Sequence, residues 1–290
     1  MLGCIGMNLT SGREPMRARF GILVGFCLAV QALPAAADTV LITGANRGIG
    51  LEFVRQYAAK GWTVIATARQ PEVAKDLMAL AAKDADIKVE RLDVVDDAQI
   101  AALAAKYRGQ AVDVVINNAG AFGDRDAQSF GQFDLDEFQS VMGVNVYGPL
   151  KVSEAFVGNV AAGRGKKIAV ISSSAGSISM VRGGPKAFYY SSSKAATNMA
   201  MKSLAETLRT QGIAVGIYMP GGVDTRMLRE AFGMNQKDAE ADMEAGKAFP
   251  AAFKPLSPEE SVKALIARLN ELDLAKSGKF INYDGSELPW

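Results

Sequence analysis

The chain has 290 residues, of which 49% are hydrophobic and 22% are charged, and its formal net charge is +1. This is the composition of an ordinary globular protein, and a near-neutral charge without basic tracts argues against nucleic acid as a primary partner. The chain has no histidine, and its only cysteines are Cys4 and Cys27. A Ser-His-Asp triad, a histidine general base and a histidine- or cysteine-bound metal in the globular part are therefore excluded. Any chemistry must use Tyr, Lys, Ser, Asn, Asp, Glu or a bound cofactor.

The first 37 residues have the three-part layout of a secretory signal. Residues 16–19 are basic, residues 20–33 are largely apolar, and residues 34–37 are small and precede Asp38. The apolar run is too short for a comfortable membrane span. We expect residues 1–37 to be a signal peptide or an N-terminal extension, and residues 38–290 to be a single domain. Use of the signal would make the protein exported or periplasmic; otherwise we expect it in the cytoplasm.

A glycine-rich turn follows the first apolar run of this domain. Residues 40–42 are apolar, glycines follow at positions 44, 48 and 50, and apolar residues then recur at helical spacing up to Ala59. This pattern predicts a buried parallel strand, a tight turn and a helix. Such a junction can direct backbone N–H groups and a positive helix end toward a phosphate. The spacing Gly44-x-x-x-Gly48-x-Gly50 differs from G-x-G-x-x-G, so taken alone it also fits a merely tight turn.

Strands and helices are predicted to alternate along the rest of the chain. Apolar or alternating runs predict strands at residues 62–67, 87–92, 112–117, 167–172, 213–219 and 279–282. Helices are predicted at residues 73–82, 96–107, 134–160 and 190–210 and from residue 257 onward. This alternation predicts an α/β fold with one doubly wound parallel sheet flanked by helices on both faces. Residues 226–256 have no clear period, and we expect them to form a lid.

Tyr190 and Lys194 lie four residues apart and therefore on one face of the helix predicted there. A free tyrosine has a pKa near 10 and is a poor base at neutral pH, but a neighbouring cation lowers that pKa. Lowering it by two or three units requires roughly 3–4 kcal/mol, which a partly desolvated lysine could supply. Tyr189 has Ser193 rather than a lysine at the same spacing. A tyrosine–lysine pair at this spacing also arises by chance, so the order of the other motifs matters.

Six motifs occur together in a characteristic order. They are Thr43-Gly-x-x-x-Gly48-Ile-Gly50, Asn117-Asn-Ala-Gly120, Asn145-Val-Tyr-Gly148, the serines at 172–174, Tyr190-x-x-x-Lys194 and Pro220-Gly-Gly-Val-Asp-Thr225. From residue 39 onward the chain resembles the short-chain dehydrogenase/reductase family. Gly176-Ser177 and Pro289-Trp290 are similar to its C-factor and carbonyl-reductase-like branch. The resemblance implies a Rossmann fold and an oxidoreductase that interconverts a carbonyl and an alcohol by hydride transfer.

The resemblance also implies four catalytic residues. Tyr190 would protonate the carbonyl oxygen during reduction, and Lys194 would lower the pKa of Tyr190 and hold the nicotinamide ribose. Ser173 would hydrogen-bond the substrate carbonyl. Ser174 is the alternative to Ser173, because three consecutive serines blur the register. Asn145 would carry a water relay to Lys194, or else be an ordinary helix asparagine.

The expected cofactor is NADP(H) rather than NAD(H). Arg69 ends the second predicted strand, where an acidic residue would favour NAD, and Arg47 in the glycine turn is a second cation. An arginine pair suits a 2′-phosphate through charge-assisted contacts. The resemblance implies further cofactor contacts at Gly44, Asn46, Gly48, Ile49, Gly50, Asn118, Ala119, Gly120, Tyr190 and Lys194, at Asp93 and Val94 for the adenine, and at Val223 and Thr225 for the carboxamide.

Two other functions stay open. One is an epimerase or dehydratase of the same fold that uses the cofactor transiently. The other is a non-catalytic dinucleotide-binding sensor or signalling protein, which would have no need of the acid/base set around Tyr190. The expected partner is a small carbonyl or alcohol substrate, with no nucleic acid and no metal, and the protein could be a homodimer or homotetramer.

Overall fold

The computed structural model describes residues 37–181, 187–232, 249–250 and 252–290, and Ala37–Trp290 form one compact unit. The expected signal peptide lies outside the described residues except for Ala37, and so does the middle of the expected lid, residues 233–248. Among the described residues, no helix is long and apolar enough to cross a membrane.

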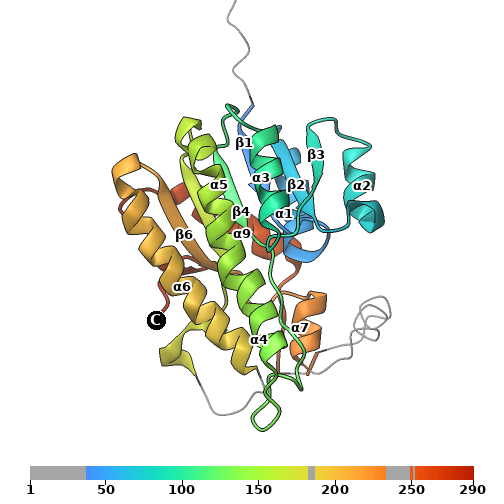
Figure 1. The fold of residues 1–290 in the computed structure, drawn as a ribbon, viewed down its shortest axis with the longest axis vertical. Coiled ribbons are helices and arrows are strands. Elements are labelled where there is room, and N and C mark those ends of the chain that lie inside the picture. Colours follow the sequence, from blue (N-terminus) through green and yellow to red (C-terminus); the bar gives the residue numbers. More distant parts are fainter. Residues whose placement is uncertain (1–36, 182–186, 233–248, 251) are drawn as a thin grey trace, which may run out of the picture. The chain divides into compact units, whose positions relative to one another are not determined.

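A seven-stranded sheet forms the centre of this unit (Figure 1), in the order β3-β2-β1-β4-β5-β6-β7, and every pairing is parallel. The strands are β1 (Thr39–Ile42), β2 (Thr63–Ala68), β3 (Ile87–Arg91), β4 (Val114–Asn117), β5 (Lys167–Ile171), β6 (Ala214–Met219) and β7 (Phe280–Asn282). This arrangement confirms the predicted doubly wound parallel sheet. The mostly apolar and buried strands are what a sheet covered on both faces requires.

The sheet changes direction at β1. This strand pairs with β2 on one side and with β4 on the other, so the chain first builds the sheet outward from β1 and then returns to extend it the other way. In open α/β sheets, ligands bind beyond the carboxyl ends of the strands at such a switch point. The turns that follow β1 and β4 are therefore where the fold places a site.

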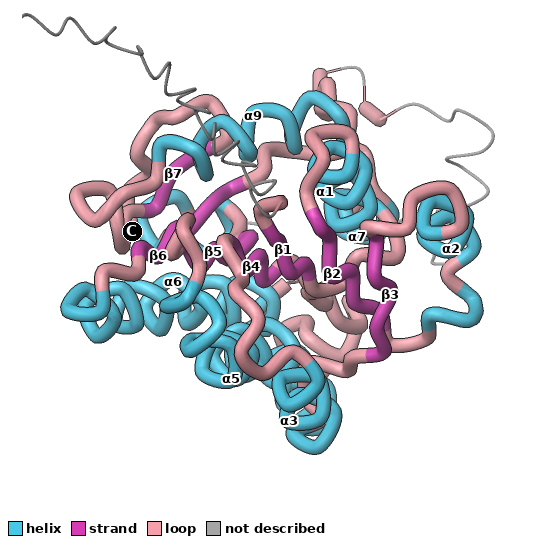
Figure 2. The backbone as a smooth tube through the Cα atoms, turned by 90° about the horizontal axis from the view of Figure 1, so that it is seen from above, coloured by secondary structure: helices cyan, strands magenta, loops and turns pink. Residues whose placement is uncertain are grey.

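Helices cover both faces of the sheet (Figure 2). One face packs against α1 (Gly48–Ala58), α2 (Lys75–Ala81) and α9 (Pro258–Glu271), and the other against α3 (Asp97–Lys106), α5 (Gly148–Ala162) and α6 (Phe188–Leu208). Phe53 and Leu265 are buried in the first core, and Phe156 and Met201 in the second. Two separate apolar cores thus fix the sheet from both sides.

The long helix predicted at residues 134–160 is interrupted. It consists of α4 (Leu135–Met142), a π-helical turn (Gly143–Tyr147) and α5. Gly148 begins α5 against Val94, where a Cβ on the glycine would lie 2.9 Å from a Val94 methyl group. Among the described residues of the expected lid, Arg226–Ala231 form the short helix α7. π-Helical turns often occur at functional sites, and this one contains Asn145.

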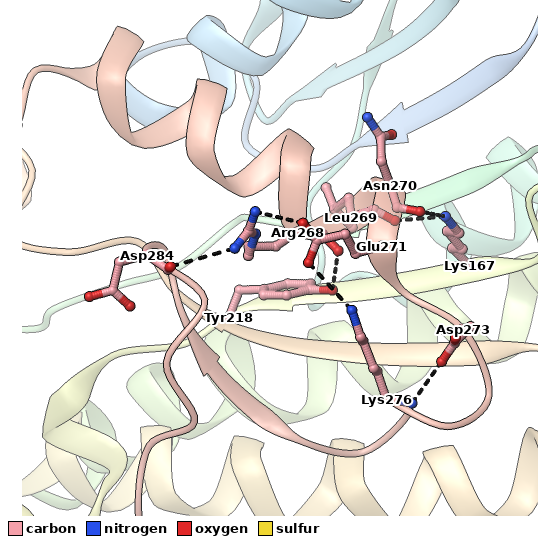
Figure 3. Close-up of polar contacts among 9 residues, drawn as sticks. All are labelled: Lys167, Tyr218, Arg268, Leu269, Asn270, Glu271, Asp273, Lys276 and Asp284. Carbon is pink, nitrogen blue, oxygen red and sulfur yellow. Dashed lines mark hydrogen bonds and ion pairs between the residues drawn. The ribbon is translucent and has the colours of Figure 1, made fainter.

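Polar contacts fasten α9 to the sheet (Figure 3). Lys167 on β5 donates through Nζ to the carbonyl oxygens of Leu269 and Asn270 near the end of the helix, and burial lowers the pKa of this lysine. Tyr218 on β6 donates to the Arg268 carbonyl at 3.3 Å, and burial raises the pKa of this tyrosine. The side chains of Lys167 and Tyr218 thus hydrogen-bond α9 and have a structural role on this face of the sheet.

Candidate active site

The glycines after β1 are required for different reasons. Gly44 and Gly48 have φ angles of +64° and +54°, in the left-handed region that glycine adopts most readily. Gly50 has no room for a side chain, because a Cβ there would lie 2.5 Å from Asn118 Nδ2 and closer still to the Gly44 carbonyl oxygen. The spacing of these residues therefore follows from the shape of the turn.

The start of α1 is available to an anion. Its N-cap residue, Arg47, makes no side-chain capping hydrogen bond, and no acidic residue lies in the first turn. The first N–H groups of a helix have no partner within the helix, and the helix dipole favours negative charge there. Asn46 and Ile49 are partly buried in the same turn, and Arg47 is exposed. The turn therefore fits the diphosphate of a dinucleotide.

The segment after β4 is fastened to this turn. Thr43 Oγ1 accepts hydrogen bonds from the backbone N–H groups of Asn118 and Ala119, each at 3.0 Å. Asn118 Nδ2 donates to the carbonyl oxygens of Thr43 and Gly44, at 2.9 and 3.1 Å. The side-chain amide of Asn118, which we expected to contact the cofactor, thus holds the turn after β1 to the segment after β4. Gly120 lies two residues further along that segment.

Three of the expected catalytic side chains come together at the carboxyl edge of the sheet. Tyr190 and Lys194 lie one turn apart in α6, with Lys194 Nζ 5.7 Å from the centre of the Tyr190 ring. Lys194 Nζ also donates to the Ile171 carbonyl at the end of β5, at 3.0 Å. The side chain of Ser173, two residues further, lies near enough to the Tyr190 hydroxyl to lower its pKa, and its Oγ accepts a hydrogen bond from the Ala175 N–H at 3.2 Å. Ser174 begins the 3-10 turn that follows.

Asn145 is buried and bonds to the loop after β4. Its Oδ1 accepts from the Ala121 N–H at 2.8 Å, and its Nδ2 donates to the Ala121 carbonyl at 2.8 Å and to Ser193 Oγ at 2.9 Å. A Cβ on neighbouring Gly120 would lie 3.4 Å from Asn145 Oδ1 and 3.7 Å from Lys194 Nζ. The small residue at 120 thus lies where the loop, the π-helical turn and α6 meet.

Burial shifts both titratable groups toward their neutral forms. It raises the pKa of Tyr190, and the Ser173 side chain opposes this only in part. It also lowers the pKa of Lys194 to about 8. The sequence predicts that Lys194 lowers the pKa of Tyr190. In the structure desolvation has the larger effect, because burial disfavours the charged form of both side chains. Tyr190 is a neutral phenol at pH 7 and so can donate a proton.

The residues expected at the adenosine end follow β2 and β3. Arg69 is exposed just after β2, and among the described residues its guanidinium makes no hydrogen bond or ion pair. Arg91 at the end of β3, by contrast, pairs with Glu72 and donates to the Arg69 carbonyl. Asp93 Oδ1 accepts from the Val95 N–H at 3.2 Å. Val94 is buried in the α3–α5 core, so only its backbone is placed to meet a ligand.

The loop after β6 reaches the glycine turn. Thr225 caps α7 by accepting a hydrogen bond from the Leu228 N–H, and its methyl group lies 3.4 Å from where a Cβ on Gly48 would be. Val223 is buried and forms a β-bridge with Leu256. Thr225 thus lies beside the glycine turn, and Val223 is fixed two residues before it.

Gln128 is a site residue that the sequence did not indicate. It lies in the loop between β4 and α4, is fully buried, and accepts a hydrogen bond from the Tyr190 N–H at 3.1 Å. A glutamine in a loop rich in Gly, Asp and Ser carries no signal that separates it from a solvated residue.

In the part of the chain that the structure describes, no group of three or more acidic, cysteine or histidine residues could hold a metal ion.

The doubly wound sheet, with its glycine turn at the switch point and a tyrosine–lysine pair at its carboxyl edge, defines a Rossmann-type α/β protein. Residues 38–236 match the short chain dehydrogenase family, and the chain belongs to that family. It is 33% identical over 260 residues to the short chain dehydrogenase gsfK of Penicillium aethiopicum, across 87% of this chain and 99% of that protein.

Two further relatives bear on function. Over 179 residues the chain is 31% identical to the C-signal of Myxococcus xanthus, across 62% of this chain and 93% of that protein. The crystal structure of NADPH-bound carbonyl reductase from chicken fatty liver aligns with a TM-score of 0.75 and 30% identity, across 88% of this chain and 100% of that one. Membership of the family and the similarity to this carbonyl reductase support oxidoreductase activity.

Proposed function

We propose that this protein is an NADP(H)-dependent reductase that interconverts a carbonyl compound and an alcohol. The observation that carries the proposal is the meeting of Ser173, Tyr190 and Lys194 beside Gly120, in the segment that follows β4. A hydroxyl that contacts a neutral phenol, with a lysine one helical turn away, is a set of groups suited to proton transfer.

The residues present fit a phosphorylated dinucleotide. The glycine turn leaves the start of α1 open to a diphosphate, and Arg69 follows β2 where an acidic residue would accept the ribose hydroxyls of NAD. NADP(H) is also supported by similar structures described as NADPH- or NADP-bound. When bound, the cofactor would supply or accept the hydride. Arg69 and Arg47 would hold its 2′-phosphate.

The chain's own residues would handle the carbonyl oxygen and its proton. The Ser173 hydroxyl would hydrogen-bond the carbonyl oxygen and hold it beside Tyr190. Tyr190 would then give its phenolic proton to that oxygen, and the raised pKa keeps this proton in place at neutral pH. Lys194 would hold the nicotinamide ribose and stabilise the phenolate left behind. Acid catalysis of this kind contributes about 10²–10⁴-fold to the rate.

A signalling role is the second candidate, favoured by the similarity to C-signal. A protein that only binds a dinucleotide would have no need of a proton donor such as Tyr190, with the Ser173 side chain beside it. An epimerase or dehydratase would use the same side chains with no net consumption of cofactor.

NADPH oxidation over a panel of carbonyl compounds distinguishes these functions. A reductase consumes NADPH in proportion to the alcohol formed. An epimerase or dehydratase converts its substrate with no net change in NADPH, and a sensor binds NADPH without turnover. Tight binding of NADPH with no turnover on any carbonyl would contradict the proposal.

A further inference from the structure

Gln128 lies in the loop between β4 and α4, and its side chain is completely buried. Its Nε2 donates to the carbonyl oxygens of Phe122 and Asp124, at 2.9 and 3.1 Å, and its Oε1 accepts from the Tyr190 N–H. Both amide hydrogens and the amide oxygen thus have partners. A buried amide without partners would be costly, so this loop conformation depends on all three bonds.

The loop is shaped to admit this amide. Gly123 has a φ angle of +86°, and a Cβ there would lie 2.6 Å from Glu137 Oε1 and 3.3 Å from Gln128 Nε2. The same Glu137 oxygen accepts from the Asp124 N–H at 2.7 Å. Asn145 holds the preceding residue, Ala121, through both of its backbone polar groups. The loop is therefore fixed on each side of Phe122.

On the helix side, Gln128 supplies a partner that α6 lacks. Tyr190 is the third residue of this helix, and the N-cap residue Ala187 makes no side-chain capping bond. An N–H at that position has no acceptor within the helix, and Gln128 Oε1 provides one. The same glutamine bonds the backbone carbonyl of Phe122. The Phe122 ring lies against the Tyr190 ring, with the two ring centres 5.0 Å apart.

We propose that Gln128 is a positioning residue for the reaction. Its amide joins the loop that contains Phe122 to the backbone of Tyr190. The Tyr190 side chain, as the proton donor, is thereby held in a fixed position relative to the Phe122 ring beside it. This inference rests on the proposed carbonyl reductase function. It assigns Gln128 no contact with the substrate or the reacting atoms.

A matched pair of variants separates positioning from general stability. Gln128→Leu and Asn159→Leu each replace a buried amide that donates to two backbone carbonyls with an apolar side chain of similar size. Asn159 donates to the carbonyls of Tyr107 and Gln110, and its own carbonyl accepts from Val112 N–H just before β4, at the opposite edge of the sheet from Tyr190. For each variant, kcat, KM for the carbonyl, Kd for NADPH and Tm are measured.

We expect both variants to lower Tm and only Gln128→Leu to lower kcat, by at least about tenfold, because a misplaced acid loses part of the 10²–10⁴-fold effect of acid catalysis. The Kd for NADPH should stay within about twofold of wild type in both. A folded Gln128→Leu protein with wild-type kcat would overturn the proposal. So would equal losses of kcat in the two variants.

Hydrogen exchange of the Tyr190 amide in the wild-type protein gives a measurement that needs no variant to fold. Because this N–H lies in the first turn of a helix, it is protected only if Gln128 accepts from it. Fast exchange at Tyr190 would refute the coupling. If wild type reduces no carbonyl, the proposed function fails, and protection at Tyr190 that is lost in Gln128→Leu would still support the coupling.

Discussion

Gly50 lies so close to the Gly44 carbonyl oxygen that no side chain fits between them. The two glycines stand at either end of the turn between β1 and α1, and Asn118 Nδ2 donates to the same Gly44 carbonyl. The turn after β1, the start of α1 and the segment after β4 thus form one packed unit. A change in any of the three should disturb the other two.

Gly50→Ala should therefore destabilise the protein and weaken NADPH binding. The new methyl group must displace backbone, which costs about 1–3 kcal/mol in a tightly packed region. Gly158→Ala is the control, because Gly158 is exposed in α5 with nothing within 4 Å of a Cβ, and it should be neutral or stabilising by up to about 1 kcal/mol. Chemical denaturation and NADPH titration of both variants check this. Wild-type NADPH affinity in Gly50→Ala would contradict the packing argument.

Lys194→Met should stabilise the cofactor-free protein at neutral pH while abolishing turnover. Burial lowers the Lys194 pKa from 10.5 to about 8, so the folded state disfavours the charged form. This penalty is complete below pH 8, falls as the pH rises from 8 to 10.5, and is absent above that range. It corresponds to at most about 3 kcal/mol. Loss of the bond to the Ile171 carbonyl offsets about 1 kcal/mol of the gain.

The measurement for Lys194→Met is the free energy of unfolding at several pH values between 6 and about 10. The advantage of the variant over wild type should shrink as the pH rises. A variant less stable than wild type at pH 7, or an advantage that grows with pH, would show that the lysine is stabilised in its charged form.

Most of the fold could be predicted because its signals are local. The apolar strands, the glycine turn and the Ser257 capping box that begins α9 each depend on a few neighbouring residues. Tyr190 and Lys194 could be paired for the same reason, since helical spacing alone puts them on one face. The π-helical turn (Gly143–Tyr147) was not predicted, because residues 134–160 have the pattern of one continuous helix.

The contacts that organise the site join residues far apart in sequence. Gln128 and Tyr190 are 62 residues apart, and Asn145 and Ala121 are 24 apart. Nothing in the sequence near Gln128 indicates that its amide is buried. Topology brings these groups together at the carboxyl edge of the sheet, so their pairing becomes visible only in three dimensions.

Tyr190→Phe should keep NADPH binding and remove most turnover, because the ring remains and only the proton donor is lost. Tyr189→Phe is the control, since Tyr189 packs between Phe133 and Phe138 on the other side of the helix start and should matter little. Steady-state kinetics and NADPH titration check both. If Tyr190→Phe retains more than about a tenth of wild-type kcat, the acid contribution expected on the 10²–10⁴ scale is absent.

Ser173→Ala should lower kcat more than Ser174→Ala. The Ser173 side chain contacts Tyr190, whereas Ser174 belongs to the 3-10 turn that follows. Removal of the Ser173 hydroxyl should also raise the Tyr190 pKa further, because the Ser173 side chain lowers it in wild type. The basic limb of a pH–rate profile should then shift to higher pH. The reverse order of the two kcat values would assign the carbonyl contact to Ser174.

Arg69→Asp tests the choice of cofactor. If Arg69 binds the 2′-phosphate, the substitution replaces an attractive charge pair with a repulsive one and should raise KM for NADPH strongly. KM for NADH should be unchanged or lower, because the ribose hydroxyls can donate to the new carboxylate. A charge contact of this kind is worth a few kcal/mol, so the ratio of the two kcat/KM values should change by at least about a hundredfold.

Arg47→Ala should change the same ratio in the same direction by less, since it removes one cation and adds no opposing charge. Arg91→Ala is the matched control, because Arg91 lies at the end of the next strand but is already paired with Glu72. Its loss should affect NADPH and NADH alike. If Arg69→Asp changes kcat/KM for NADPH and for NADH by the same factor, Arg69 does not bind the 2′-phosphate and is a solvated residue at a strand end. A wild-type enzyme that prefers NADH would refute the assignment without any variant, because neither arginine would then be binding a phosphate.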